Sequence, residues 1–153
     1  MGASEEVQKI LPIRARKRRN ILVVDDDRMM RELLELHLTA AGYNVALAED
    51  AVVAGRMFLA STPDLLLIDI NMPYMSGLDF VATLFADATV PMIPVVFMTA
   101  HEHFTRHTDE LGADSLIKPI LKGVLLETVA RNLDPKSRNE RVAGGAAYRS
   151  LNI

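Results

Sequence analysis

The chain has 153 residues, enough for one domain with a sizeable core, and half of these residues are hydrophobic. It contains no cysteine, which excludes disulfides and zinc–thiolate sites and is compatible with the cytoplasm as the expected location. No apolar run approaches the ~20 residues that a membrane span requires, and the N-terminus lacks the apolar stretch of a secretory signal.

The net charge of −3 conceals a basic cluster near the N-terminus. Without the five residues of this cluster, 12 basic residues face 20 acidic ones, a net charge of −8. The cluster consists of Arg14, Arg16, Lys17, Arg18 and Arg19. A short cluster without aromatic neighbours is a weak signal for nucleic-acid binding, and a solvated leader explains it better. We therefore expect residues 1–19 to be a basic N-terminal extension with no clear nucleic-acid partner.

Strand and helix patterns alternate along residues 20–133. The expected strands are residues 21–24, 43–48, 65–68, 95–98 and 115–117. The expected helices are residues 28–41, 51–60, 76–85, 103–111 and 120–133. This alternation predicts an α/β fold in which helices cover both faces of a five-stranded parallel sheet. Residues 134–153 are too few for a second folded domain and are expected to be a C-terminal tail.

Local signals mark several helix ends and faces. An acidic residue before position 28 suits a helix N-cap, and Gly42 suits the end of that helix. Ser76 followed by Asp79 has the spacing of a capping box. In the helix over 51–60, four apolar residues are expected to face inward. They are Val52, Val53, Met57 and Phe58.

The run from Leu65 to Ile68 leads directly into Asp69, and Pro73 prevents the strand from continuing. An unbroken apolar run of this length suits a strand that is buried on both faces. Ligands bind at the carboxyl ends of such strands, and aspartate is almost never buried unless it is paired. Asp69 is therefore predicted to take part in chemistry rather than in packing.

Under the strand order 2-1-3-4-5, one of the common doubly wound orders, the polar ends of four neighbouring strands meet. Their residues are Asp25 and Asp26, Asp69, Thr99, and Lys118. Three carboxylates this close repel one another, and a divalent cation would remove the repulsion. All-oxygen ligands suit Mg²⁺, with Mn²⁺ as an alternative. With Lys118 facing a phosphoryl oxygen, Asp69 is predicted to be a nucleophile that forms an acyl phosphate.

Four ordered motifs, each containing or following an apolar strand, resemble the receiver domain of two-component response regulators over about residues 20–133. The motifs are Val-Val-Asp-Asp-Asp at 23–27, Leu-Leu-Leu-Ile-Asp-Ile-Asn-Met-Pro-Tyr-Met-Ser-Gly at 65–77, Val-Val-Phe-Met-Thr-Ala at 95–100 and Leu-Ile-Lys-Pro at 116–119. The resemblance implies a CheY-like, flavodoxin-like doubly wound fold.

The resemblance also implies a role for each matching position. Asp69 would accept a phosphoryl group from a phosphohistidine on a sensor histidine kinase or a histidine phosphotransfer protein. Asp26 would bind Mg²⁺ directly, Asp25 would bind it mostly through water, and the backbone carbonyl of Asn71 would complete the protein ligands. Lys118 would pair with the phosphoryl group, and its peptide bond to the following proline would be cis.

On phosphorylation, Thr99 would move its hydroxyl to the phosphoryl group, with assistance from the amide of Ala100. This movement would change the surface formed by the helix over 103–111, the strand over 115–117 and the helix over 120–133, where a downstream protein would bind. The expected chemistry is limited to the gain and loss of the chain's own phosphoryl group. The chain is therefore expected to be a switch rather than an enzyme.

One departure from the family pattern affects this switch. The family usually has Tyr or Phe three residues before the lysine, and this chain has Ser115. Serine cannot fill the space left by the threonine with a ring, so we expect the output to be read elsewhere or through smaller shifts. The resemblance also implies that Asn71 and His101 flank the route of an attacking water. His101, His103 and His107 are expected to form a solvated helix face rather than a metal site.

Other functions are compatible with the sequence. Haloacid-dehalogenase-like phosphatases typically have a second aspartate two residues after the nucleophile, whereas this chain has Asn71, which cannot do general acid–base work. A phosphorylation-independent pseudo-receiver that serves as an interaction module would explain Ser115, although the acceptor, metal, Thr and Lys positions are all filled. Either terminal segment could also mediate a homodimer.

Overall fold

The computed structural model of the chain describes residues 17–136, so the expectations for residues 1–16 and 137–153 lie outside the described residues. Five strands form one parallel sheet in the order β2-β1-β3-β4-β5, as predicted. The strands are β1 (Asn20–Val24), β2 (Asn44–Ala48), β3 (Leu65–Asp69), β4 (Val95–Thr99) and β5 (Asp114–Ile117). This arrangement confirms the flavodoxin-like doubly wound fold.

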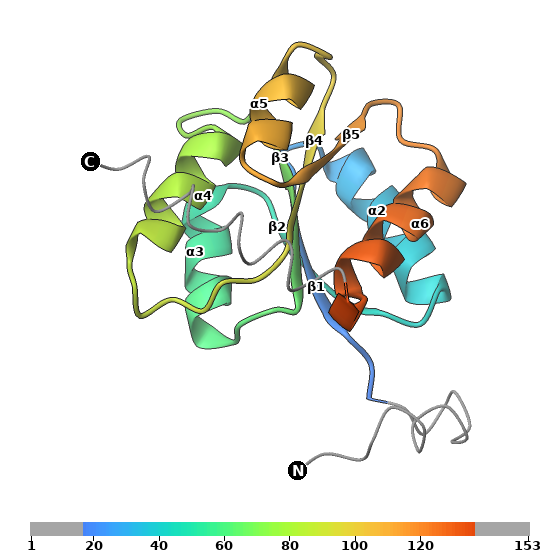
Figure 1. Ribbon diagram of the computed structural model, residues 1–153. Coiled ribbons are helices and arrows are strands. Elements are labelled where there is room, and N and C mark those ends of the chain that lie inside the picture. Colours follow the sequence, from blue (N-terminus) through green and yellow to red (C-terminus); the bar gives the residue numbers. More distant parts are fainter. Residues whose placement is uncertain (1–16, 137–153) are drawn as a thin grey trace.

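Five helices cover the two faces of the sheet (Figure 1). On one face lie α2 (Arg28–Ala40) and α6 (Lys122–Leu133). On the other face lie α3 (Ala51–Ala60), α4 (Gly77–Ala86) and α5 (Phe104–Glu110). Among residues 17–136, none of the helices has the length and apolar character that crossing a membrane requires.

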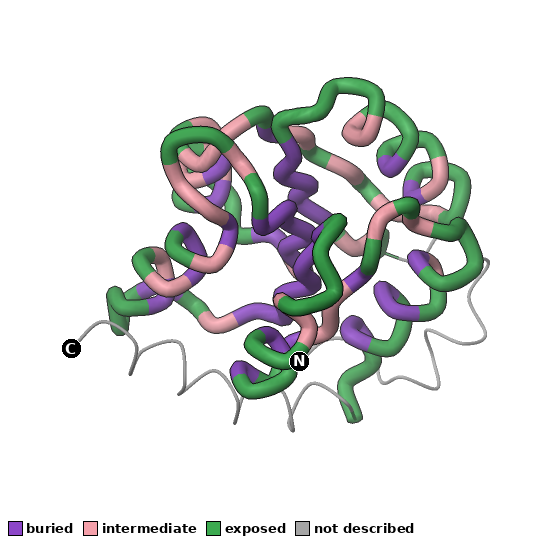
Figure 2. The backbone as a smooth tube through the Cα atoms, turned by 90° about the horizontal axis from the view of Figure 1, so that it is seen from above, coloured by how far each residue is buried: buried purple, intermediate pink, exposed green. Residues whose placement is uncertain are grey.

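The strands separate two hydrophobic cores because their side chains alternate between the two faces of the sheet. Leu66 and Ile68 of β3 pack with α3 and α4, whereas Leu65 and Leu67 pack with α2 and α6. All five residues of β3 are buried, as expected for a central parallel strand. Figure 2 shows the buried residues in the middle of the molecule and along the inner sides of the helices.

The local end signals of two helices are confirmed. Asp27 caps α2 by accepting a hydrogen bond from the backbone N–H of Met29 at 2.9 Å. Ser76 caps α4 by accepting one from the N–H of Asp79 at 3.1 Å. After α2, Gly42 has a φ of +99°, a conformation that glycine adopts without steric cost. The observed ends of the elements differ from the expected ones by no more than two residues.

The inward orientation predicted for Val52 is wrong, because its side chain is 67% exposed. Phe58 is buried together with Ala54, four residues earlier, and these two residues define the inner face of α3. Val52 lies two residues before Ala54, about 200° around the helix, and therefore faces outward. Val53 and Met57 lie at the side of this face, where they are half-buried against the core.

Candidate functional site

The carboxyl ends of four strands bring the predicted site residues to one edge of the sheet. Asp69 and Thr99 are the last residues of β3 and β4, and Asp25 directly follows β1. Lys118 directly follows β5, and its backbone N–H donates a hydrogen bond to the carbonyl oxygen of Thr99 at 2.8 Å. The parallel register therefore places all four strand ends beside one another.

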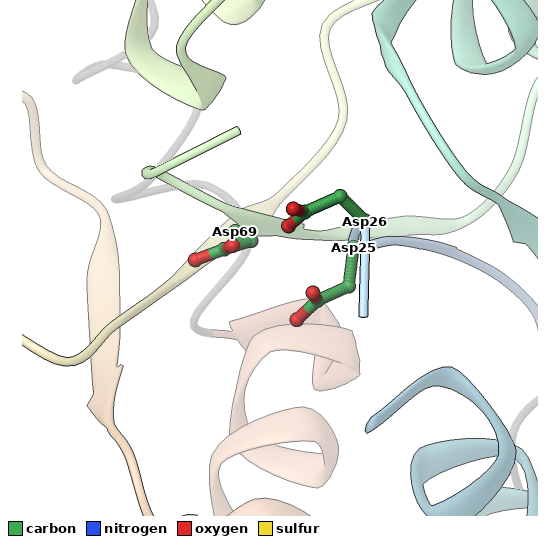
Figure 3. Close-up of side chains that lie close together, drawn as sticks. All are labelled: Asp25, Asp26 and Asp69. Atoms are coloured by element: carbon green, nitrogen blue, oxygen red, sulfur yellow. The ribbon is translucent and has the colours of Figure 1, made fainter. Parts of the chain in front are cut away.

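Three carboxylates converge at this edge. One oxygen of each of Asp25, Asp26 and Asp69 lies within 4.8 Å of the other two. Figure 3 shows the side chains of Asp25 and Asp26 extending toward Asp69. Asp25 is completely buried and Asp69 is only 3% exposed, whereas Asp26 is exposed to solvent. The site therefore has two desolvated carboxylates and one that is accessible from the outside.

The three consecutive aspartates have different roles in the structure. Asp25 and Asp26 belong to the carboxylate cluster, whereas Asp27 caps α2. The backbone N–H of Asp27 also donates a hydrogen bond to the Oδ1 of Asp25 at 2.9 Å. The capping function and the site therefore coexist in this short segment, and each belongs to a different side chain.

Lys118 supplies the positive charge of the cluster. Its Nζ lies 2.8 Å from the Oδ2 of Asp25 and 3.5 Å from the Oδ1 of Asp69. Burial lowers the pKa of Lys118, but the hydrogen bond to Asp25 and the two negative charges outweigh burial and raise the pKa above its ordinary value. The peptide bond between Lys118 and Pro119 is cis, as the family resemblance implies.

The environment of Asp69 strongly raises the pKa of its carboxyl group. Burial and the nearby charge of Asp25 raise its pKa to about 6, against the opposing effects of Lys118 and the backbone N–H of Asn71. Strongly perturbed carboxyl groups in a cluster of this kind are candidates for functional groups. The carboxylate is therefore held in a setting that favours its neutralisation by a proton, a metal ion or a covalent bond.

Thr99 is completely buried, and its hydroxyl contacts two loops. The Oγ1 accepts a hydrogen bond from the backbone N–H of His101 at 3.0 Å. The same oxygen lies 3.4 Å from the Oδ1 of Asn71, in the loop between β3 and α4. Ala100, which follows Thr99, is exposed at the same edge. The predicted Thr99 and Ala100 thus lie at the end of β4, although the contacts of Thr99 are with loops rather than with Asp69.

Two residues that support the site are not evident as such from the sequence. A Cβ atom on Gly77 would overlap the carbonyl oxygen of Asp69, and the Gly77 N–H donates a hydrogen bond to the carbonyl of Ile70 at 2.9 Å. Arg31 of α2 donates a hydrogen bond from its guanidinium group to the backbone carbonyl of Asp25 at 2.7 Å. A glycine directly after the capping residue Ser76 is the one sequence feature that points to the close approach of Gly77 to Asp69. No local sequence pattern indicates the contact between Arg31 and Asp25.

His101, His103 and His107 are exposed, as expected, but only His107 lies within α5. Within residues 17–136, the carboxylate cluster is the one group with the geometry for a metal ion. The ring of His103 instead packs on Phe104, with the ring centroids 4.3 Å apart. His101 and His103 therefore form an aromatic cluster with Phe104.

The donor set of the carboxylate cluster suits a hard divalent cation. When ionised, the three carboxylates and Lys118 have a combined charge of −2, and all three ligand atoms are oxygens. Mg²⁺ prefers oxygen ligands and usually binds one or two protein carboxylates together with a phosphate. The cluster could hold such an ion, with its exposed side at Asp26 open to a second reactant.

Comparison with known proteins agrees with this architecture. Residues 21–130 match the family described as the response regulator receiver domain, and the chain belongs to this family. Its curated relatives include the response regulator MprA of Mycobacterium tuberculosis strain H37Rv, which is 36% identical over 129 residues. That alignment covers 80% of this chain and 55% of the relative, so the chain spans about half the length of the curated relatives it matches.

Solved structures of the same class are also similar. The chemotaxis response regulator CheY4 of Vibrio cholerae superposes with a TM-score of 0.70 at 28% identity, over 76% of this chain and all of that chain. A response regulator described as putative, from Chloroflexus aurantiacus J-10-fl, superposes with a TM-score of 0.71 at 29% identity, over 76% of this chain and 98% of that chain. The described chain is therefore a receiver domain in both sequence and fold.

Proposed function

We propose that this receiver domain is a phosphorylation-controlled switch in which Asp69 accepts a phosphoryl group from a phosphohistidine. The observation that carries the proposal is the setting of Asp69, which is 3% exposed, lies within 4.8 Å of two further carboxylates and has an ammonium group 3.5 Å away. A buried carboxylate between acidic groups and one cation suits a group that gains and loses a phosphoryl group.

The transfer is a substitution at phosphorus. A carboxylate oxygen of Asp69 forms a bond to the phosphorus as the phosphorus–nitrogen bond of the donor histidine breaks. The electron pair of the broken bond stays on that nitrogen, which takes up a proton. Lys118 is close enough to pair with a phosphoryl oxygen, because its Nζ already lies 3.5 Å from Asp69. It would stabilise the negative charge that the phosphoryl group brings to the site.

Mg²⁺ would be held by Asp25, Asp26, Asp69 and the backbone carbonyl of Asn71, with Mn²⁺ as a substitute. When bound, it supplies positive charge that stabilises the transferring phosphoryl group. Asp26 and Asn71 are exposed, so the ion can enter from solvent. The buried Asp25 accepts hydrogen bonds from the Asp27 N–H and from Lys118, and these contacts would orient its carboxylate for the ion.

The donor would be a sensor histidine kinase or a histidine phosphotransfer protein that docks next to the carboxylates. Helix α2 begins directly after the three consecutive aspartates. Its residues Met29, Leu33 and Leu36, at positions i, i+4 and i+7, form one exposed apolar stripe. A stripe with this spacing on the outer face of a helix suits packing against another helix. Met29 is two residues from Asp27, so a partner on this stripe would reach the site.

The output would pass from Thr99 and Ala100 to the face formed by α5, β5 and α6. Exposed apolar side chains lie along this face at Ile117, Leu121 and Val124, which supports a protein partner there. Ser115 is half-buried on β5, in register with Phe97 of β4. Without an aromatic ring at position 115, we infer that the movement of Thr99 is transmitted by the loop to α5 rather than by a rotating side chain.

The wider setting is part of the same proposal. Residues 20–133 would be the receiver domain between a basic extension (1–19) and a tail (134–153), and either end could support a homodimer. We infer a cytoplasmic location. We also infer that the chain catalyses at most its own phosphorylation and dephosphorylation and does not act on external substrates.

Incubation with acetyl phosphate and Mg²⁺, followed by intact-mass measurement, tests the proposal directly. We expect a gain of one phosphoryl group, which Asp69→Asn and removal of Mg²⁺ by a chelator should both abolish. A folded protein that gains nothing from acetyl phosphate or from a phosphohistidine donor would instead be a phosphorylation-independent interaction module. Sustained turnover of an external phosphomonoester would show a phosphatase.

A further inference from the structure

The side chain of Asn71 contacts Thr99 across the two strand ends. Its carboxamide Oδ1 lies 3.4 Å from the hydroxyl oxygen of Thr99. The backbone N–H of the same residue favours the ionised form of the Asp69 carboxyl group and so lowers its pKa. Asn71 therefore contacts both the proposed phosphoacceptor, through its backbone, and the hydroxyl that is proposed to respond to it, through its side chain.

The hydroxyl proton of Thr99 is weakly held in this arrangement. The Oγ1 accepts a good hydrogen bond from the N–H of His101 at 3.0 Å. Its own proton has two acceptors within reach, the Oδ1 of Asn71 at 3.4 Å and the carbonyl oxygen of His101 at 3.5 Å. Both distances are near the upper limit for a hydrogen bond, and a hydroxyl has only one proton to donate.

We propose that the side chain of Asn71 is a positioning residue that holds Thr99 in its resting orientation and so sets how readily Thr99 turns toward a phosphoryl group on Asp69. This inference rests on the proposed phosphoacceptor function. A phosphoryl oxygen competes with the Asn71 carboxamide for the same hydroxyl proton. The hydroxyl binds the phosphoryl oxygen in preference, because a hydrogen bond to a charged oxygen is stronger than one to a neutral amide. The free energy needed to turn Thr99 toward the phosphoryl group therefore includes the loss of its contact with Asn71.

The chain permits a clean test of this contact. Asn71→Ala removes the carboxamide but keeps the backbone N–H that reaches Asp69 and the carbonyl proposed as a metal ligand. Asn71 is exposed, so the truncation leaves no buried cavity. A neutral hydrogen bond contributes modestly to an equilibrium, and a long one lies at the low end of that range. We therefore expect a change of about twofold to fivefold.

The experiment is a double-mutant cycle with beryllium fluoride, which mimics a phosphoryl group on a carboxylate, in the presence of Mg²⁺. The apparent Kd is measured for the wild type, Asn71→Ala, Thr99→Val and the double variant. We expect Asn71→Ala to bind about twofold to fivefold more tightly, because a resting restraint that opposes binding is removed. Thr99→Val should bind more weakly, and adding Asn71→Ala to it should have no further effect.

A second measurement follows Thr99 itself. In the NMR spectrum of the resting protein, Asn71→Ala should shift the Thr99 methyl and His101 amide resonances toward their beryllium fluoride-bound positions. A merely structural role of Asn71 would not produce this directed shift. The inference would be overturned if Asn71→Ala changed the Kd by the same factor in the wild type and in the Thr99→Val variant. It would also be overturned if Asn71→Ala left the Kd of the otherwise wild-type protein unchanged.

These outcomes are separate from failure of the proposed function. If the wild type neither binds beryllium fluoride nor gains a phosphoryl group from acetyl phosphate, the phosphoacceptor function is overturned and this inference with it. If phosphorylation at Asp69 proceeds but the cycle is additive, only the role of Asn71 is overturned. Asn71 would then act on the phosphoryl group or on an attacking water without involving Thr99.

Discussion

Lys118 forms its short contact with Asp25, at 2.8 Å, and remains 3.5 Å from Asp69, the proposed phosphoacceptor. Asp25 is completely buried, so it is the carboxylate that most needs a compensating charge. The lysine thus stabilises the unphosphorylated site mainly through Asp25. This leaves a carboxylate oxygen of Asp69 available to an incoming phosphoryl group.

Replacement of Lys118 by methionine should destabilise the metal-free protein. The variant leaves Asp25 and Asp69 without their cation, and loss of one partner of a buried ion pair costs about 2–4 kcal/mol of unfolding free energy. Mg²⁺ should restore much of this loss, because it supplies positive charge to the same carboxylates. Urea unfolding with a chelator and with saturating Mg²⁺ measures both effects. Lys122→Met, at the exposed start of α6, is the control and should change stability by less than about 0.5 kcal/mol.

Asp69→Asn should stabilise the metal-free protein at neutral pH. The pKa of Asp69 in the folded protein is about 6, above its ordinary value of 3.8. The stabilising contribution of the protonated group is therefore fully present below pH 3.8 and is lost as the pH rises through about 6. The variant should gain up to about 3 kcal/mol over the wild type at pH 8 and little at pH 3.5.

Unfolding by urea at several pH values, with a chelator present, checks this dependence. Asp109→Asn on α5 is a matched control, because it removes one exposed negative charge far from the cluster. A stability difference for Asp69→Asn that is the same at pH 4 and pH 8 would contradict the prediction. The same protonation should weaken Mg²⁺ binding below about pH 6, because protons and the ion compete for one carboxylate.

Asp26 and Asp27 should be separable by mutation. Asp27→Ala removes the N-cap of α2 and should lower stability by about 1 kcal/mol, with little change in Mg²⁺ affinity. Asp26→Ala should greatly weaken Mg²⁺ binding with little loss of stability, since its side chain is exposed. Thermal unfolding and a Mg²⁺ titration of both variants provide the comparison. Equal effects of the two substitutions on Mg²⁺ affinity would show that Asp27 belongs to the metal site.

Gly77→Ala should be among the most damaging small substitutions in the chain. The new Cβ would overlap the carbonyl oxygen of Asp69, so the backbone at the end of β3 must shift, at a cost of about 2–4 kcal/mol. Gly123→Ala is the matched control, because a Cβ there meets no atom within 4 Å and the residue is in α6. It should stabilise the protein by about 0.5–1 kcal/mol. Denaturation curves of the two variants should therefore move in opposite directions.

The fold and most of the site could be predicted because their signals are local. The apolar run before Asp69 and the residues that end the other strands identify the sheet and its functional edge. Once the strands are parallel and ordered, the convergence of Asp25, Asp69, Thr99 and Lys118 follows from geometry. The ordered motifs that carry the family resemblance contain these same strand ends and site residues.

The remaining features depend on contacts between residues that are distant in sequence. Others fall in segments where polar and apolar residues do not distinguish the outer face from the inner face. In α3, Arg56 is the only charged residue, so its outer face has little polar marking and the orientation of Val52 could not be inferred. The approach of Gly77 to Asp69 and the contact of Arg31 with Asp25 arise only when the elements pack. The different roles of Asp25, Asp26 and Asp27 likewise depend on how β1 and α2 pack in the fold.

The helix that follows Thr99 is weakly anchored. α5 has seven residues, its N-terminus lacks a side-chain cap, and Thr108 is its one buried residue. By contrast, α6 has twelve residues, of which five are buried. A short helix with little buried surface opens at a small fraction of the free energy of global unfolding. The amides of α5 should therefore exchange with solvent faster than those of α6, so the helix next to Thr99 is the one that can shift at least cost.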